Sequence, residues 1–339
     1  MKMRTTRFLL VALAALAVQT HAQTDVATTI GEFLLIEPSA RIGAMGNAGS
    51  SISTEPMAAY YNPASLGSMP GWGVQFTHSR WLADIAYDYA IATVPIGASS
   101  SGMLNFTSLR SGDIAVRTVD QPLGTGENYS VNDLAIGLGY GVRITDKIAA
   151  GLQLTYVQET IWHSNTTVIG LNFGTQYRLS EDGIMIGASL SNFGTRNNFT
   201  GTDLRILYAI TSNPTQNGSN NAMPAEFYTD TYGLPLLFRV GIALPVTVAE
   251  GHDFLFAVDA FHPNNNTESV SLGGEYTFSK TFSVRAGYQN LFEQDSEAGL
   301  TLGAGVLFEA SGTDVHFDYG WTQYGRLGNI QRMTVGFTF

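Results

Sequence analysis

Apolar and polar residues alternate with a period of two along most of the chain beyond Gly71. The last segment is typical: it reads Arg-Met-Thr-Val-Gly-Phe-Thr-Phe over 332–339, with a large apolar residue at every second position. This period indicates β-strands that have one apolar face. The pattern predicts fourteen strands, at 72–80, 84–95, 100–109, 130–144, 148–160, 165–179, 184–193, 235–246, 252–261, 268–278, 282–291, 299–309, 313–321 and 329–339.

The composition of the two strand faces separates a membrane barrel from a soluble sandwich, since both alternate. One face carries the large apolar and aromatic residues, and the other is mostly Gly, Ser, Thr and charged residues. Such strands, even in number and joined alternately by short and longer connections, are typical of outer-membrane barrels. We therefore predict an all-β fold: a 14-stranded antiparallel transmembrane β-barrel over 72–339, in the bacterial outer membrane, with both termini periplasmic.

One hairpin can be predicted residue by residue. If Ser279-Lys280-Thr281 is a three-residue loop, Phe278 faces Phe282 and Glu275 faces Arg285. The aromatic pair then lies outward at the membrane interface, where aromatic rings gather. The ion pair lies in the lumen.

Composition and charge narrow the class of protein further. Charged residues make up 13% of the chain and the formal net charge is −11, whereas soluble domains average about 25% charged residues. Nucleic-acid binding, which needs dense positive charge, is disfavoured. The chain has no cysteine, which excludes disulfides, thiolate metal sites and a cysteine nucleophile.

The first residues have the pattern of a signal peptide. Lys2, Arg4 and Arg7 precede the apolar run 8–18, and Thr20-His21-Ala22 provides a cleavage site before Gln23. The apolar run is too short for a transmembrane helix, which needs about 20 residues. We assign 1–22 to a signal peptide.

The next segment, 23–71, lacks the strand pattern and is predicted to pack inside the barrel as a hatch. It is rich in small residues, which permit close backbone packing, and Asn62-Pro63 is a turn initiator. Its motifs are Ala-Arg-x-x-x-Met-Gly at 40–46 and Tyr-Asn-Pro-Ala at 61–64. The candidate hatch residues are Arg41, Met45, Gly46, Asn62, Pro63 and Ala64.

These motifs, together with Trp-Leu-Ala-Asp-Ile at 81–85 and Tyr-Asp-Tyr at 87–89, resemble the PorV/PorQ family within the FadL-like outer-membrane superfamily. The resemblance covers the whole mature chain. It implies a 14-stranded barrel with an N-terminal hatch, in agreement with the count of strands. Gly46-Asn47 stands where relatives often have Gly-Gly, and Ser65 where FadL-like proteins often have Gly.

The candidate chemistry is a polar lumen network and not an active site. His316 lies between Asp314 and Asp318 on one strand face, and a carboxylate can orient a histidine. No motif supplies a serine nucleophile, the histidines lack metal-ligand spacing, and the glycines at 43–49 lack the dinucleotide-binding spacing. We expect no catalytic, cofactor or metal site. The predicted network is Glu275, Arg285, Asp314, His316, Asp318 and Arg332.

Three functions are considered. The PorV/PorQ resemblance implies a non-enzymatic component of the type IX secretion system, which binds or shuttles cargo with C-terminal signal domains and has the translocon and cargo as partners, within outer-membrane lipid. The broader resemblance implies a FadL-like passive channel for hydrophobic small molecules, and the third function is a lipid-modifying hydrolase. Because charged residues face inward in the C-terminal strands, we favour the secretion role.

Phe339 is predicted to complete a C-terminal strand that the barrel-assembly machinery recognises, because an open strand edge can be paired by another protein. Replacing Phe339 by Ser should lower the amount of barrel assembled in the outer membrane, measured by immunoblotting of membrane fractions. Normal assembly of this variant would contradict the prediction.

Overall fold

The structure, a computed structural model, describes residues 29–53, 55–180, 183–208, 223–294 and 296–339. The predicted signal peptide, 1–22, and the first six residues of the predicted hatch lie outside these ranges. Within them, no helix is long and apolar enough to cross a membrane.

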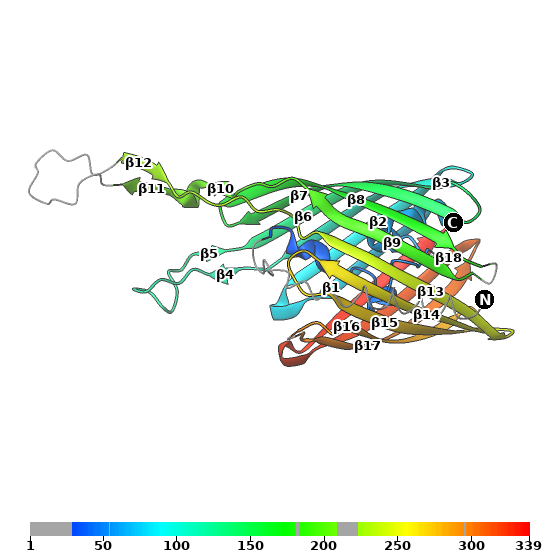
Figure 1. The fold of residues 1–339 in the computed structure, drawn as a ribbon. Coiled ribbons are helices and arrows are strands. Elements are labelled where there is room, and N and C mark those ends of the chain that lie inside the picture. The colour runs from blue at the N-terminus through cyan, green and yellow to red at the C-terminus, as the bar shows by residue number, and fades with distance from the viewer. Residues whose placement is uncertain (1–28, 54, 181–182, 209–222, 295) are drawn as a thin grey trace, which may run out of the picture.

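A closed antiparallel barrel forms the body of the molecule (Figure 1). The main sheet has 15 strands; one of them, β10 (Thr200–Gly201), adds only two residues beside β8, and the remaining 15 − 1 = 14 close into a ring because β8 also pairs with β9. Around the ring they are β8 (Ser164–Arg178), β7 (Ile148–Ile161), β6 (Val131–Arg143), β3 (Ser100–Arg110), β2 (Ala86–Gly97), β1 (Gly73–Arg80), β19 (Asn329–Thr338), β18 (Thr313–Tyr324), β17 (Ala298–Ala310), β16 (Phe282–Leu291), β15 (Ser269–Phe278), β14 (His252–Pro263), β13 (Leu237–Ala249) and β9 (Met185–Gly194).

All fourteen predicted strands are confirmed, with small shifts at their ends. The strand β2, predicted over 84–95, begins two residues later than predicted because Leu82–Asp84 form a short 3-10 helix, η3, and β13 also begins two residues later than predicted. The predicted hairpin register is also confirmed: Glu275 pairs with Arg285 and Phe278 with Phe282.

The outward face of the barrel is apolar and exposed. Leu104, Leu138 and Leu152 on β3, β6 and β7 are each about half exposed, as are Phe256 on β14 and Leu302 on β17. A surface of this kind is stable when lipid covers it, and a closed ring leaves no strand edge to be satisfied in lipid.

The two ends of the barrel differ. At the short-turn end, strands are joined by turns such as 279–281, and Phe339 lies there. At the long-loop end, two hairpins that the sequence analysis did not predict project from the barrel (Figure 1): β4 (Ile114–Ala115) with β5 (Asn128–Tyr129), and β11 (Arg205–Tyr208) with β12 (Met223–Glu226). Two 3-10 helices also lie in the long loops, η4 (Thr202–Leu204) and η5 (Gly325–Leu327).

The N-terminal segment lies within the ring (Figure 1). Its first described residue, Thr29, pairs with Gly233 at the long-loop end, and the chain then runs through the barrel to β1. Contacts with strands on different sides of the ring hold it: the Gly46 amide donates to Thr301 on β17, and those of Gly49 and Ser50 donate to Asp259 on β14. Its helices are η1 (Glu32–Leu35), α2 (Ala40–Gly43), α3 (Ala58–Tyr61) and η2 (Pro63–Ser68).

Inward-facing glycines of the wall make room for the backbone of this segment. A Cβ built on Gly273 would overlap the Met45 carbonyl oxygen, and one on Gly320 would come within 2.7 Å of the Ala40 carbonyl oxygen. The glycine content of the inward strand faces is therefore a packing requirement. The wall glycines whose Cβ would meet the backbone of the segment are Gly141, Gly151, Gly187, Gly273, Gly287 and Gly320, and those whose Cβ would meet its side chains are Gly174, Gly241 and Gly303.

Replacing Gly273 by Val should destabilise the barrel by about 1–3 kcal/mol, the usual cost of overpacking a well-packed interior. The adjacent Gly274 faces outward, and its Cβ would make only ordinary contacts with Phe256, so Gly274→Val is the matched control. Urea unfolding in lipid vesicles, followed by tryptophan fluorescence, measures both. Equal stability of the two variants would contradict the packing role.

Candidate functional site

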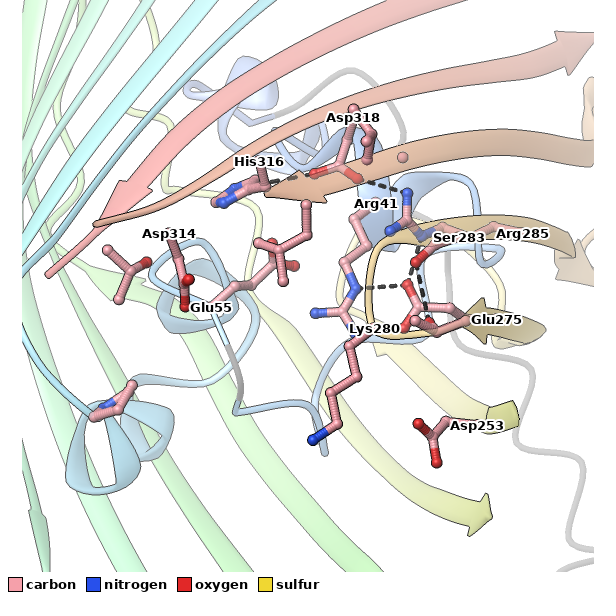
Figure 2. A pocket seen from close by; sticks show the side chains of 16 residues that line it. Arg41, Glu55, Asp253, Glu275, Lys280, Ser283, Arg285, Asp314, His316 and Asp318 are labelled. Carbon is pink, nitrogen blue, oxygen red and sulfur yellow. Dashed lines mark hydrogen bonds and ion pairs between the residues drawn. The ribbon is translucent and has the colours of Figure 1, made fainter. Parts of the chain in front are cut away.

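A buried ionic network joins the N-terminal segment to the wall near the short-turn end (Figure 2). Both nitrogens on one edge of the Arg41 guanidinium donate to Glu275, at 2.7 and 2.6 Å. Arg285 donates to the same carboxylate at 2.5 Å and to Asp318 at 2.6 Å. The wall residues face inward because β15, β16 and β18 alternate, and they are nearly fully buried.

A cavity of about 390 Å³ lies against this network. Asp253, Lys280 and Asp314 line its wall with the network residues, as does His316. The His316 ring lies 2.5 Å from the Gln75 amide and 4.0 Å from Asp318. Pro70, Val306 and Leu307 also line the cavity, so charged side chains cover only part of its wall. An apolar molecule placed against the charged part would remove those groups from water at a cost in free energy.

The predicted network is thus brought together only in part. Glu275, Arg285 and Asp318 are directly joined by ion pairs, and His316 lies beside Asp318. Asp314 lines the same cavity but forms no hydrogen bond or ion pair with these described residues. Arg332 lies elsewhere: it pairs with Glu37 at 3.0 Å and lies over the Trp81 ring.

The hatch motif residues are buried and make contacts that fix the segment. The Asn62 amide donates to the carbonyls of Ser50 and Thr175, at 2.8 and 3.0 Å, and its oxygen caps η2 by accepting from Ala64. Pro63 begins η2. Gly46 adopts a φ of 67°, which favours glycine. The bond from Arg41 to Glu275 was not foreseen, since nothing in the sequence pairs positions 234 residues apart.

A second lumen region is apolar, on the opposite side of the ring. Tyr87, Tyr89 and Ile91 of β2 face inward and are almost fully buried. The alternation of residues within 86–92 indicates this apolar inward face, whereas the C-terminal strands by themselves indicate a charged lumen. We call this region the apolar lumen cluster; it comprises Ile30, Phe33, Ile36, Met57, Ala59, Leu66, Tyr87, Tyr89, Ile91, Met103, Ala135, Val157, Val168 and Leu234.

Tyr60 and Arg239 border this cluster. The Tyr60 hydroxyl donates to the Leu34 carbonyl at 2.7 Å, and burial raises the pKa of this phenol well above its usual value, so it keeps its proton. Arg239 is 2% exposed, lies over the Tyr60 and Phe261 rings and donates to Ser191 at 3.1 Å. These contacts hold α3 against β13.

Outside the barrel, the bases of the two projecting hairpins enclose a pocket of about 840 Å³. Its lining is largely apolar, with Arg117 and Asp203 as its charged members. Phe199 lines this pocket and also packs against the apolar lumen cluster. The outer pocket and the lumen cluster are therefore in contact through one aromatic side chain.

The wall is irregular between β8 and β9, beside the cluster. Leu171 pairs with Phe193 but Phe173 pairs with Leu190, so β9 has one extra residue, and Asn192 adopts a φ of 64°. A β-bulge of this kind locally disrupts the ladder. Close by, the Leu234 side chain fills the space left by two paired glycines, Gly170 and Gly194: a Cβ on either would come within 2.8 Å of it.

The hydrolase interpretation finds no support in the arrangement. Ser283 lines the charged cavity, but its hydroxyl bonds to Thr277 at 3.0 Å, while the His316 ring bonds to Gln75. A nucleophile and its base need to lie within hydrogen-bond reach. Across the described ranges, no three His, Asp or Glu side chains are placed to hold a metal ion.

Replacing Glu275 by Gln should lower the free energy of unfolding by about 3 kcal/mol, because it leaves two buried guanidinium groups without this carboxylate. Glu268→Gln is the control, since Glu268 and its partner His262 are both about 60% exposed and an exposed pair contributes less than about 1 kcal/mol. Urea unfolding of both variants in vesicles measures the difference; a small effect at Glu275 would show that the network does not hold the segment.

Comparison with known proteins identifies the fold. No protein-family model and no curated protein matches the chain. Among solved structures, it is similar to the CymD monoaromatic hydrocarbon channel (TM-score 0.54, 13% identity, 90% of this chain and 98% of that one) and to the Ralstonia pickettii toluene transporter TbuX (0.56, 13%, 89% and 97%). It is also similar to a Pseudomonas aeruginosa FadL homologue (0.56, 10%, 89% and 98%). The chain therefore has the 14-stranded barrel fold of the FadL-like channels.

Proposed function

We propose that this protein is a passive, non-enzymatic channel that carries small hydrophobic molecules across the bacterial outer membrane. The observation that carries the proposal is the contact, through Phe199, between the apolar outer pocket and the apolar lumen cluster. Hydrophobic ligands bind in largely apolar pockets with few polar groups. The similar structures described as a toluene transporter and a monoaromatic hydrocarbon channel support this substrate class.

The outer pocket is the first binding place on this route. It lies beyond the barrel at the long-loop end, where a molecule from outside would arrive, and Ile161, Trp162 and Leu204 give it an apolar wall. From there the substrate passes Phe199 to the cluster. This step transfers apolar surface between two apolar environments, so it carries no large desolvation cost.

The charged cavity directs the substrate sideways. An apolar molecule that continued along the axis would meet the N-terminal segment and then Arg41, Glu275 and Arg285. The bulged wall at Leu234 offers another path into lipid, because the Leu234 side chain there fills the space beside two paired glycines, Gly170 and Gly194. We propose that the substrate leaves the lumen through this wall when Leu234 moves.

The secretion role was favoured because charged residues face the lumen in the C-terminal strands. The lumen is charged only in part, since strands β2, β3, β6, β7 and β8 place apolar residues in it. A type IX role, with its translocon and cargo partners, stays a prediction without support from the contacts described above. That the N-terminal segment closes the lumen as a hatch also stays a prediction.

Uptake of radiolabelled toluene by cells that lack other hydrocarbon channels tests the proposed function. Cells that express this protein should accumulate toluene faster than cells with an empty vector. Equal rates, with the barrel assembled in the outer membrane, would contradict the channel proposal.

Replacing Leu234 by Ala tests the lateral route. The Leu234 side chain fills the space beside the paired glycines Gly170 and Gly194, so a smaller side chain leaves this part of the wall more open. Uptake should rise roughly fivefold, which corresponds to about 1 kcal/mol in the barrier. The control is Leu138→Ala, which shortens an exposed leucine on the outward face of β6, away from the bulge. Equal uptake rates in the two variants would exclude this exit.

A further inference from the structure

The outward faces of β1, β2 and β3 differ in the size and charge of their side chains. The outward positions of β2 over 86–92 are small or acidic, whereas those on β1 and β3 beside them are large or basic, apart from Ser108. The register aligns them in four rows from the long-loop end: Arg80–Ala86–Arg110, His78–Asp88–Ser108, Phe76–Ala90–Phe106 and Val74–Ala92–Leu104. The middle strand is thus lower than its neighbours in three of the four rows.

The lower rows make an apolar groove. Phe76 and Phe106 are 45% and 43% exposed and flank Ala90, the small residue between them. The next row repeats the arrangement with Ala92 between Val74 and Leu104. The four rows span six residues along a strand, roughly 20 Å, which in a tilted strand suffices to cross one half of the roughly 30 Å hydrocarbon core.

Two exposed arginines lie at the top of the groove, with Asp84 and Asp88 beside them. The side chains of Arg80 and Arg110 are 80% and 58% exposed, and two strand spacings separate them, roughly 9.5 Å, so both can reach one group above Ala86. Among the described residues of the fourteen ring strands, they are the only outward-facing arginines or lysines at the long-loop end.

Acidic neighbours orient these side chains and leave donors exposed. Asp88 accepts from His78 at 2.7 Å and from Arg110 at 2.6 Å, with one oxygen for each. Asp84 contacts Arg80 at 3.6 Å in a fully exposed pair, which is weak. A guanidinium has five N–H donors, so each arginine can still donate to an anion.

We propose that this surface binds a phosphate-bearing membrane lipid, with its phosphate between Arg80 and Arg110 and one acyl chain in the groove over Ala90 and Ala92. Arginine binds phosphate through paired N–H donors, and the groove continues downward from that point into the hydrocarbon region. The exposed guanidinium donors of Arg80 and Arg110 and the order of the rows both fit an amphiphile with an anionic head and an apolar tail. This surface faces away from the lumen, so the inference is independent of what the channel carries.

Native mass spectrometry of the purified full-length protein, titrated with phosphatidylglycerol in detergent, tests the proposal. The double variant Arg80→Gln, Arg110→Gln should weaken binding roughly tenfold, since each basic residue at a membrane surface contributes to the attraction of anionic lipids. The control Lys147→Gln, Arg205→Gln removes the same charge from an exposed turn residue and an exposed residue of β11, both away from the groove, and should bind as the natural chain does. Equal weakening in both double variants would overturn the proposal, because general charge would then explain the binding.

A third variant tests the groove itself. Ala90→Phe keeps every charge but fills the space between Phe76 and Phe106, and it should also weaken phosphatidylglycerol binding severalfold. Inorganic phosphate at millimolar concentration should not compete. If Ala90→Phe binds the lipid as the natural chain does, or if inorganic phosphate displaces the lipid, the site recognises a phosphate and not a lipid, and the proposal is wrong.

Discussion

Closure of the sheet is the constraint on which the rest of this structure depends. In lipid every backbone amide and carbonyl must be satisfied within the protein, and the ring of fourteen strands achieves this only because β8 pairs with β9 and β1 with β19. Once the ring is closed, its outward positions must be apolar and its inward positions must fill or line a lumen. The alternation of apolar and polar residues along each strand follows from this difference between outward and inward positions.

The lumen is filled unequally. On the side of β15, β16 and β18, buried ion pairs join the N-terminal segment to the wall. Removing one partner of a buried ion pair is strongly destabilising, because the other charge is left buried and unpaired. On the side of β2 and β8, the same segment packs through apolar contacts against residues such as Tyr87 and Val168. The N-terminal segment is therefore held by charged contacts on the first side and by apolar packing on the second.

The sequence predicted the strands well because each one carries its own period and its own turn. The pair Glu275–Arg285 could be placed from a three-residue loop alone, since register follows from loop length in a hairpin. The bond from Arg41 to Glu275 could not, because it joins a strand to a segment with no period. Nor could the bulge at Asn192, whose backbone conformation has no signature in the residues Ser191-Asn192-Phe193. The apolar lumen cluster could have been predicted in part from the sequence, because Tyr87, Tyr89 and Ile91 stand at every second position, as the apolar residues of the outward faces do.

The wall glycines also bear on how the chain reaches this state. Ser50 bonds to a residue 209 positions later, and Gly46 to one 255 positions later, so the N-terminal segment makes some of its contacts with strands that are synthesised much later. Contacts so distant in sequence form slowly. These contacts can form only after β14 and β17 have been synthesised, and the glycines of the late strands, such as Gly273, then admit the backbone of the segment without having to move a side chain.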